Sequence, residues 1–229
     1  MRQKGNMMAE KGILVVVSGF SGAGKGTLMK RLMEKYDNYA LSVSATTRAP
    51  RPGEEHGREY FFHTKQEFEE LILQDALIEY AQYVENYYGT PKAYVEKQLN
   101  AGKDVMEQLE AGKNVILEIE IQGALKVKKK LPDTLLLFVT PPTAEELKRR
   151  LVNRGTETMD VIESRLRRAS EEAEGMSEYD YILINDQIEE CVDKMHAIIQ
   201  SQHETVKNRR DFIKEITEEI AVFEKGEEE

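Results

Sequence analysis

A glycine-rich segment, GFSGAGKGT (residues 19–27), most limits what this chain can fold into. It comes directly after an apolar, β-branched run at residues 13–17 and directly before a segment in which Leu28 and Leu32 keep helical spacing. A strand, a loop of small residues and a helix in this order are typical of a phosphate-binding loop (P-loop). In such a loop, backbone N–H groups and the start of the helix face phosphate oxygens. We therefore predict a site for a nucleoside triphosphate.

The lysine in this loop supplies a mobile positive charge for the phosphates. The predicted ATP-binding residues of the loop are Gly19, Ser21, Gly22, Ala23, Gly24, Lys25, Gly26 and Thr27. The general pattern has Ser or Thr directly after the lysine, whereas this chain has Gly26 there and Thr27 next. Three arrangements of Mg²⁺ stay open: Thr27 binds it directly, Thr27 binds it through a water, or phosphates and waters hold it.

Short apolar runs alternate with helical patterns along the rest of the chain. The runs lie at residues 13–17, 39–46, 114–120, 134–140 and 179–185. This alternation predicts an α/β fold of three layers, with a mainly parallel sheet flanked by helices. Thr143 and Glu146 form a predicted capping box that starts a helix ending at Gly155. Residues 49–94 differ in composition from the alternating pattern because they contain a Pro- and Gly-rich turn. We predict that they form an insertion at the sheet's edge.

Composition excludes several classes of protein. A chain of 229 residues with 40% hydrophobic composition suits one globular unit, and a net charge of −10 argues against a nucleic-acid binder. The single Cys191 excludes an internal disulfide, and the four His residues lack metal-ligand spacing. The apolar run at 13–17 is too short for a signal peptide or a membrane span, so we expect a cytoplasmic protein with no membrane partner.

A second phosphate site is indicated by Arg48 and Arg51, which lie three residues apart on a proline-braced loop. Two guanidinium groups held in this way can grip a phosphate dianion, and Tyr60 can add a hydroxyl donor. A solvated basic turn explains the two arginines equally well.

The segment around these arginines resembles the signature of the guanylate kinase family. The match comprises Thr46, Thr47, Arg48, Arg51, Glu54, Gly57, Tyr60 and Phe62. The resemblance runs from about residue 11 to about residue 207 and includes the segments at 78–91, 116–124, 154–158 and 184–187. It implies an enzyme that transfers the γ-phosphoryl group of ATP to GMP with Mg²⁺. It also implies a P-loop fold that carries a small GMP-binding insertion and a helical lid.

The resemblance also implies roles for individual residues. Ser44, Glu79 and Thr90 would line the guanine pocket, and Arg48, Arg51, Tyr60 and Tyr88 would hold the GMP phosphate. A carboxylate suits the two adjacent donors of guanine, N1–H and the 2-amino group, whereas adenine reverses this pattern, so Glu79 would select guanine. Glu118 and Glu120, expected two apart on one strand, would face the nucleotides. Arg154 and Arg165 would be lid residues, and Asn185 would lie beside the adenine. The catalytic set is Lys25, Arg48, Arg51, Arg154 and Arg165.

The expected organisation follows from the same resemblance. Residues 1–10 form a tail, 11–207 the kinase domain, and 208–229 a charged C-terminal helix with an acidic end. Within the domain the core spans 11–43, 95–147 and 175–207, the GMP-binding region 44–94 and the lid 148–174. A tandem echo, VEKQLNAGKD and VMEQLEAGKN, occupies residues 95–114. The expected partners are ATP and GMP, with the chain a monomer or a homodimer.

Three other functions are compatible with parts of this pattern. A non-catalytic module of the same fold would tend to lose the loop lysine or the lid arginines, which this chain retains. A kinase for another nucleoside monophosphate is disfavoured by Glu79 and Tyr60. The third is a GTPase or mechanical ATPase of the P-loop class, and no Asn-Lys-x-Asp guanine motif occurs in the chain.

Overall fold

The computed structural model describes residues 12–83, 85–91, 113–153 and 158–224. Its main sheet is parallel, with the strand order β2-β7-β1-β8-β9. In that order the strands are Tyr39–Leu41, Asn114–Glu118, Leu14–Gly19, Leu135–Thr140 and Tyr181–Ile184. The predicted α/β fold is confirmed, and so are the strands expected around 13–17, 134–140 and 179–185.

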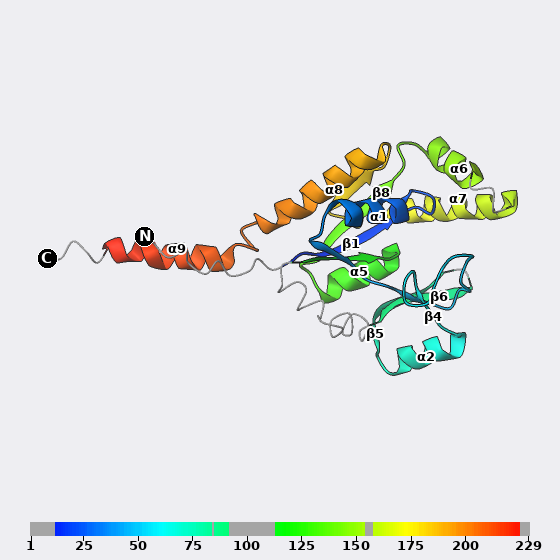
Figure 1. The fold of residues 1–229 in the computed structure, drawn as a ribbon, viewed down its shortest axis with the longest axis horizontal. Coiled ribbons are helices and arrows are strands. Elements are labelled where there is room, and N and C mark those ends of the chain that lie inside the picture. The colour runs from blue at the N-terminus through cyan, green and yellow to red at the C-terminus, as the bar shows by residue number, and fades with distance from the viewer. Residues whose placement is uncertain (1–11, 84, 92–112, 154–157, 225–229) are drawn as a thin grey trace.

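Helices cover both faces of this sheet, as Figure 1 shows. Val15 and Val17 of β1 pack in the larger core with α1 (Lys25–Lys35) and α8 (Ile188–His203). Val16 points the other way and packs with Ala124 and Val127 of α5 (Ile121–Lys130). Because successive strand residues face opposite layers and both layers are apolar, β1 needs an unbroken hydrophobic run.

A second, smaller sheet lies beside the main one and has the strand order β4-β3-β6-β5. Its strands are Phe61–Phe62, Ala45–Thr46, Asn86–Pro91 and Leu77–Tyr83. Helix α2 (Lys65–Leu73) packs on it through the fully buried Phe68. Thr64 starts α2 with a complete capping box, in which its hydroxyl accepts from Glu67 N and the Glu67 carboxylate accepts from Thr64 N.

The single strand predicted at residues 39–46 is wrong. The chain instead leaves the main sheet after β2, where Ser42 N donates to Ile116 O, and enters the small sheet at β3. One apolar pattern thus covers strands of two sheets, because the strand residues on both sides of the crossing, except the exposed Leu41, are buried or half-buried. Sequence periodicity carries no signal for such a change of partner.

Two helices lie near the carboxyl end of the main sheet, α6 (Ala144–Asn153) and α7 (Met159–Glu174), followed by the short 3-10 helix Gly175–Glu178. The capping box predicted for α6 is only half formed. Thr143 Oγ1 accepts from Glu146 N at 3.1 Å, but the Glu146 carboxylate binds Arg149 and Arg150 instead of turning back to the cap. The predicted end at Gly155 lies outside the described residues.

The surface helix expected near the C-terminus is present as α9 (Arg210–Glu224), which extends away from the rest of the molecule in Figure 1. Of the echo at 95–114, only residues 113 and 114 are described. Within the described ranges, every helix is either too short or too polar to cross a lipid bilayer.

Candidate functional site

The glycine-rich loop joins β1 to α1 at the carboxyl end of the main sheet (Figure 1). Gly22 and Gly24 have φ values of +97° and +90°, in the left-handed region that other residues seldom adopt. A Cβ on Gly24 would also lie 2.6 Å from Nδ2 of Asn185. The backbone therefore curls as predicted only because these positions are glycine.

Lys25 is the first residue of α1, and its side chain folds back over this loop. Its Nζ donates to the carbonyl oxygens of Gly19 at 2.7 Å and Phe20 at 3.2 Å. The ammonium group therefore lies beside the start of α1, where the helix dipole also favours an anion. This geometry brings the charge and the backbone donors of a phosphate cradle together.

A buried asparagine contacts the backbone of the glycine-rich loop. Asn185 is only 4% exposed, and its Nδ2 donates to Ala23 O at 2.8 Å. Arg150 of α6 donates from Nη2 to Asn185 O at 2.9 Å, while Glu146 holds its Nε at 2.7 Å. The structure thus places Asn185 as a support of the loop backbone, and its predicted contact with adenine stays a prediction.

Helix α7 reaches the loop from the other side. Arg165 Nη1 donates to the Ser21 hydroxyl at 2.6 Å, so one predicted lid arginine already contacts the predicted ATP site. Further along α7, burial raises the pKa of Glu172, with Lys25 and Arg168 opposing the shift. The helix therefore carries both signs of charge next to the loop. The other predicted lid arginine, Arg154, lies outside the described residues.

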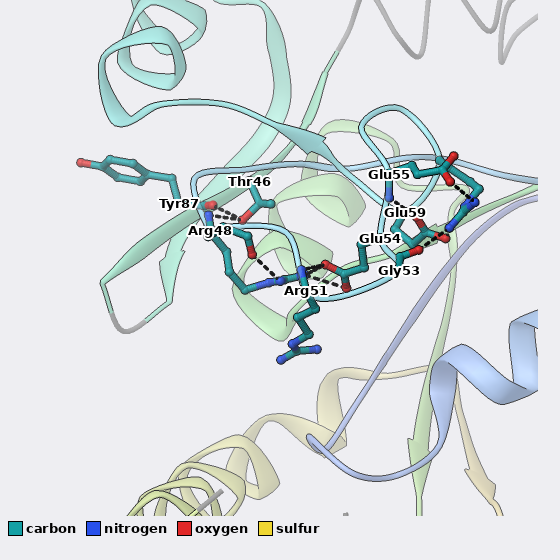
Figure 2. Close-up of polar contacts among 10 residues, drawn as sticks. Thr46, Arg48, Arg51, Gly53, Glu54, Glu55, Glu59 and Tyr87 are labelled. Atoms are coloured by element: carbon teal, nitrogen blue, oxygen red, sulfur yellow. Dashed lines mark hydrogen bonds and ion pairs between the residues drawn. The ribbon is translucent and has the colours of Figure 1, made fainter. Parts of the chain in front are cut away.

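Arg48 is held in a fixed orientation in the small sheet's loop. Its Nη2 donates to both oxygens of Glu54, at 3.0 and 2.9 Å, and its Nη1 donates to Ala49 O at 2.7 Å (Figure 2). The guanidinium also lies over the rings of Tyr60 and Phe62, 5.3 and 5.8 Å from their centroids. The side chain is therefore restrained on several sides.

Tyr60 and Tyr88 lie next to Arg48, with their ring centroids 6.1 Å apart. Burial raises the pKa of Tyr60 to about 12, and the Glu118 carboxylate adds to the shift. The Tyr60 hydroxyl consequently stays protonated at neutral pH and can donate a hydrogen bond. Arg51 is exposed, and Figure 2 shows its guanidinium directed away from Glu54. The structure thus brings three predicted phosphate residues together and leaves Arg51 at the rim.

Glu79 is a buried carboxylate on β5, only 5% exposed. Its Oε1 accepts a hydrogen bond from Oγ1 of Thr90, on the neighbouring strand β6, at 2.8 Å. Burial raises the pKa of Glu79 to about 7, with the Thr90 hydrogen bond opposing the shift. Gly123 of α5 faces this carboxylate, because a Cβ there would lie 2.5 Å from Oε2. Two predicted guanine-pocket residues are therefore in contact, and half-buried Ser44 directly precedes β3 of the same sheet.

The predicted shared face of Glu118 and Glu120 on one strand is wrong. Strand β7 ends at Glu118, and Glu120 is the residue that precedes helix α5. Glu120 instead pairs with Arg168 of α7 at 3.5 Å, while Glu118 acts on Tyr60 through its charge. The two carboxylates thus contact different neighbours, because the strand ends at Glu118 and Glu120 is the N-cap residue of helix α5.

A metal site made only of protein ligands is not found in the described ranges, where no group of three or more His, Cys, Asp or Glu side chains could hold an ion. Thr27 lies in the first turn of α1 with its side chain exposed. An exposed hydroxyl in the first turn of α1 fits Mg²⁺, which prefers oxygen ligands and keeps several waters.

Three residues of the site were not singled out from the sequence. Glu54 belongs to the family signature, and its spacing from Arg48 is the only sequence signal for its role. Arg150 and Arg168 belong to a basic stretch that resembles a solvated helix face. Only their contacts with Asn185 and Glu120 reveal that they face the site.

Comparisons with known proteins agree with this geometry. The sequence model of a family described as Guanylate kinase matches residues 11–202. The guanylate kinase of Lactococcus lactis subsp. lactis is 50% identical over 196 residues, which cover 86% of this chain and 91% of that protein. The guanylate kinase of Bacillus cereus is 47% identical over 213 residues, 93% of this chain and 99% of that protein.

A solved structure gives the same result for the fold. The crystal structure of guanylate kinase from Anaplasma phagocytophilum superposes with a TM-score of 0.69 at 30% sequence identity. The superposition covers 87% of this chain and 90% of that one.

Proposed function

This chain belongs to the guanylate kinase family and is a phosphotransferase of the nucleoside monophosphate kinase class. From that premise we propose that it transfers the γ-phosphoryl group of ATP to GMP, giving ADP and GDP, in the cytoplasm. The GMP-binding region is residues 44–94, and the lid is residues 148–174. One observation supports the proposal most strongly. The structure contains both a glycine-rich loop with Lys25 folded over it and a small sheet that carries Arg48 beside Tyr60 and the buried Glu79.

The donor ATP would bind at the glycine-rich loop. Lys25 and the N–H groups at the start of α1 would meet its phosphates, and Arg165 would reach them from α7. The contact of Arg165 with Ser21 supports this role, because it places the guanidinium at the loop. Arg154 would join the same phosphates from the lid.

The acceptor GMP would bind in the small sheet. Arg48, Arg51, Tyr60 and Tyr88 would hold its phosphate as donors of hydrogen bonds, and the two arginines also carry positive charge. Glu79 would accept from N1–H and the 2-amino group of guanine. Adenine presents an acceptor at N1, so a carboxylate there would be left facing a lone pair, and AMP would bind poorly.

Catalysis would rest on alignment and charge. The attacking oxygen belongs to a phosphate whose second pKa is about 6, so it is already deprotonated at neutral pH and needs no general base. The cationic side chains offset the repulsion between two anions, and this effect grows when the lid excludes water. Closure would also keep water from the γ-phosphate.

Mg²⁺, bound with ATP, would supply further positive charge at the phosphates. Thr27 is the residue of the loop that could hold it, directly or through a water, and Glu118 would order its waters. Its exposed hydroxyl and the carboxylate's partial exposure suit an ion that keeps much of its water shell.

The decisive experiment measures ADP release by the purified protein with ATP and Mg²⁺ and, in turn, GMP, AMP, UMP and CMP. We expect turnover with GMP and little with the other three. A lack of turnover with GMP would refute the proposal, and equal turnover with AMP would remove Glu79 from the pocket.

A Lys25→Met variant tests the loop in the same assay. It should lose most turnover and keep GMP affinity close to wild type, because Lys25 belongs to the donor site alone. Lys30→Met, an exposed lysine on the same helix, is the matched control. Wild-type turnover in Lys25→Met would show that the loop is not the phosphate cradle.

A further inference from the structure

We propose that Glu54 is a positioning residue for phosphoryl-acceptor binding, whose carboxylate fixes both the Arg48 guanidinium and the backbone of Arg51. The inference rests on the GMP site proposed above and adds to it a residue that would not touch the substrate. Its support is the geometry of the loop between β3 and β4.

The Glu54 carboxylate joins the two arginines through three hydrogen bonds. Both of its oxygens accept from Arg48 Nη2, at 3.0 and 2.9 Å, and Oε2 also accepts from the backbone N of Arg51 at 2.8 Å. The side chains of the ion pair are only 16% and 17% exposed, so water screens them weakly. Figure 2 shows the contacts of this carboxylate with both arginines.

Other parts of the Arg48 guanidinium also make contacts. The rings of Tyr60 and Phe62 lie against it, and Ala49 O accepts from Nη1. Glu54 completes this set of contacts. Without it, the guanidinium group would be able to rotate about the last side-chain bonds of Arg48. A donor already held in its binding orientation loses less conformational freedom when the ligand arrives, and affinity rises accordingly.

A competing effect has the opposite sign. A carboxylate beside a phosphate site repels the phosphate dianion and neutralises part of the Arg48 charge. Three observations favour positioning over repulsion. Glu54 binds Arg48 at Nη2, at the end of the guanidinium; the Arg51 guanidinium points away from Glu54; and the same carboxylate orders the loop backbone through Arg51 N.

The test is Glu54→Gln, which keeps the shape of the side chain and removes its charge. We expect KM for GMP to rise about tenfold, while KM for ATP changes by less than about twofold, because a charge-assisted bond near the acceptor phosphate is weakened. Glu54→Asp keeps the charge and should recover part of the loss. The control is Glu55→Gln, since Glu55 is exposed and pairs with Arg58 on the outer side of the same loop; its KM for GMP should stay at the wild-type value.

Two further measurements separate positioning from loop stability. Competition by guanosine, which lacks the phosphate, should be equally strong against the wild type and Glu54→Gln, whereas a disordered loop would weaken both ligands. In a double-mutant cycle, Glu54→Gln should add little to the loss caused by Arg48→Ala, because both changes act through one guanidinium.

Different results would refute the proposed phosphate site and the positioning role of Glu54. If Arg48→Ala leaves KM for GMP unchanged, the proposed phosphate site itself is wrong. If Arg48→Ala raises KM but Glu54→Gln leaves it unchanged or lowers it, the phosphate site stands and the positioning role of Glu54 is refuted. Additive losses in the cycle would refute that role as well.

Discussion

Replacing Glu79 by glutamine should make the protein more stable above neutral pH and a poorer kinase for GMP. The carboxylate is 5% exposed, and its hydrogen-bond donor in the folded protein is the Thr90 hydroxyl. Burial raises its pKa from an ordinary 4.5 to about 7, and the negative charge of Glu120 adds to the shift. Folding therefore opposes the charged form that guanine recognition requires.

The size of the stability effect follows from this pKa. Between pH 4.5 and about 7 the folded protein keeps a proton on Glu79 that the unfolded chain has released, so stability falls as the pH rises through this window. Above the window the accumulated loss is about 3 kcal/mol. Glutamine carries no charge and can still accept from Thr90, so it should avoid this loss. The melting temperature at pH 8 should rise by about 5–10 °C, with little change at pH 4.

The functional effect has the opposite direction. A carboxylate can accept from two guanine donors, whereas the glutamine amide can accept with its oxygen only and presents its own donors to the second. Losing such charge-assisted hydrogen bonds should lower kcat/KM for GMP by about 10²–10⁴. The wild-type enzyme should also lose GMP affinity as the pH falls below about 7, because Glu79 becomes protonated.

Thermal melting at pH 4 and pH 8 and ADP release with GMP and AMP measure both effects. Glu70→Gln is the matched control, since Glu70 is an exposed glutamate on α2. The reasoning would be refuted by a variant that melts like the wild type at pH 8, or by one that still prefers GMP over AMP to the wild-type degree.

Three other changes test separate parts of the site. Gly123→Ala would place a Cβ 2.5 Å from Glu79 Oε2, so KM for GMP should rise. This rise is expected although alanine is the better helix former by about 1 kcal/mol. An unchanged KM would show that α5 does not confine the carboxylate. Asn185→Ala removes the donor to Ala23 O and should lower stability by about 1–2 kcal/mol in a denaturant titration, with KM for ATP rising more than KM for GMP. Thr64→Ala removes the capping hydroxyl of α2 and should lower stability by about 1 kcal/mol. A change in KM for ATP would contradict a purely structural role of Thr64.

Local patterns in the sequence were sufficient for the central features of this protein. The strand, glycine loop and helix around Lys25 each have a local signal. β-branched residues indicate the strand, glycines that can adopt positive φ indicate the loop, and helical spacing of apolar residues indicates the helix. The loop of Arg48 was found in the same way, through short spacings that match a family signature. The signals for these features lie within short stretches of the chain, so the sequence alone predicts them.

Contacts between distant segments could be established only from the tertiary structure. The run at 39–46 is divided between two sheets, and Glu120 leaves its strand to face Arg168, because the partner of each residue lies elsewhere in the chain. Asn185 supports Ala23 across 162 positions of sequence. The raised pKa of Glu79 likewise depends on burial by its surroundings, which has no local signal. Burial and long-range pairing are properties of the packed molecule, and residue type and spacing do not specify them.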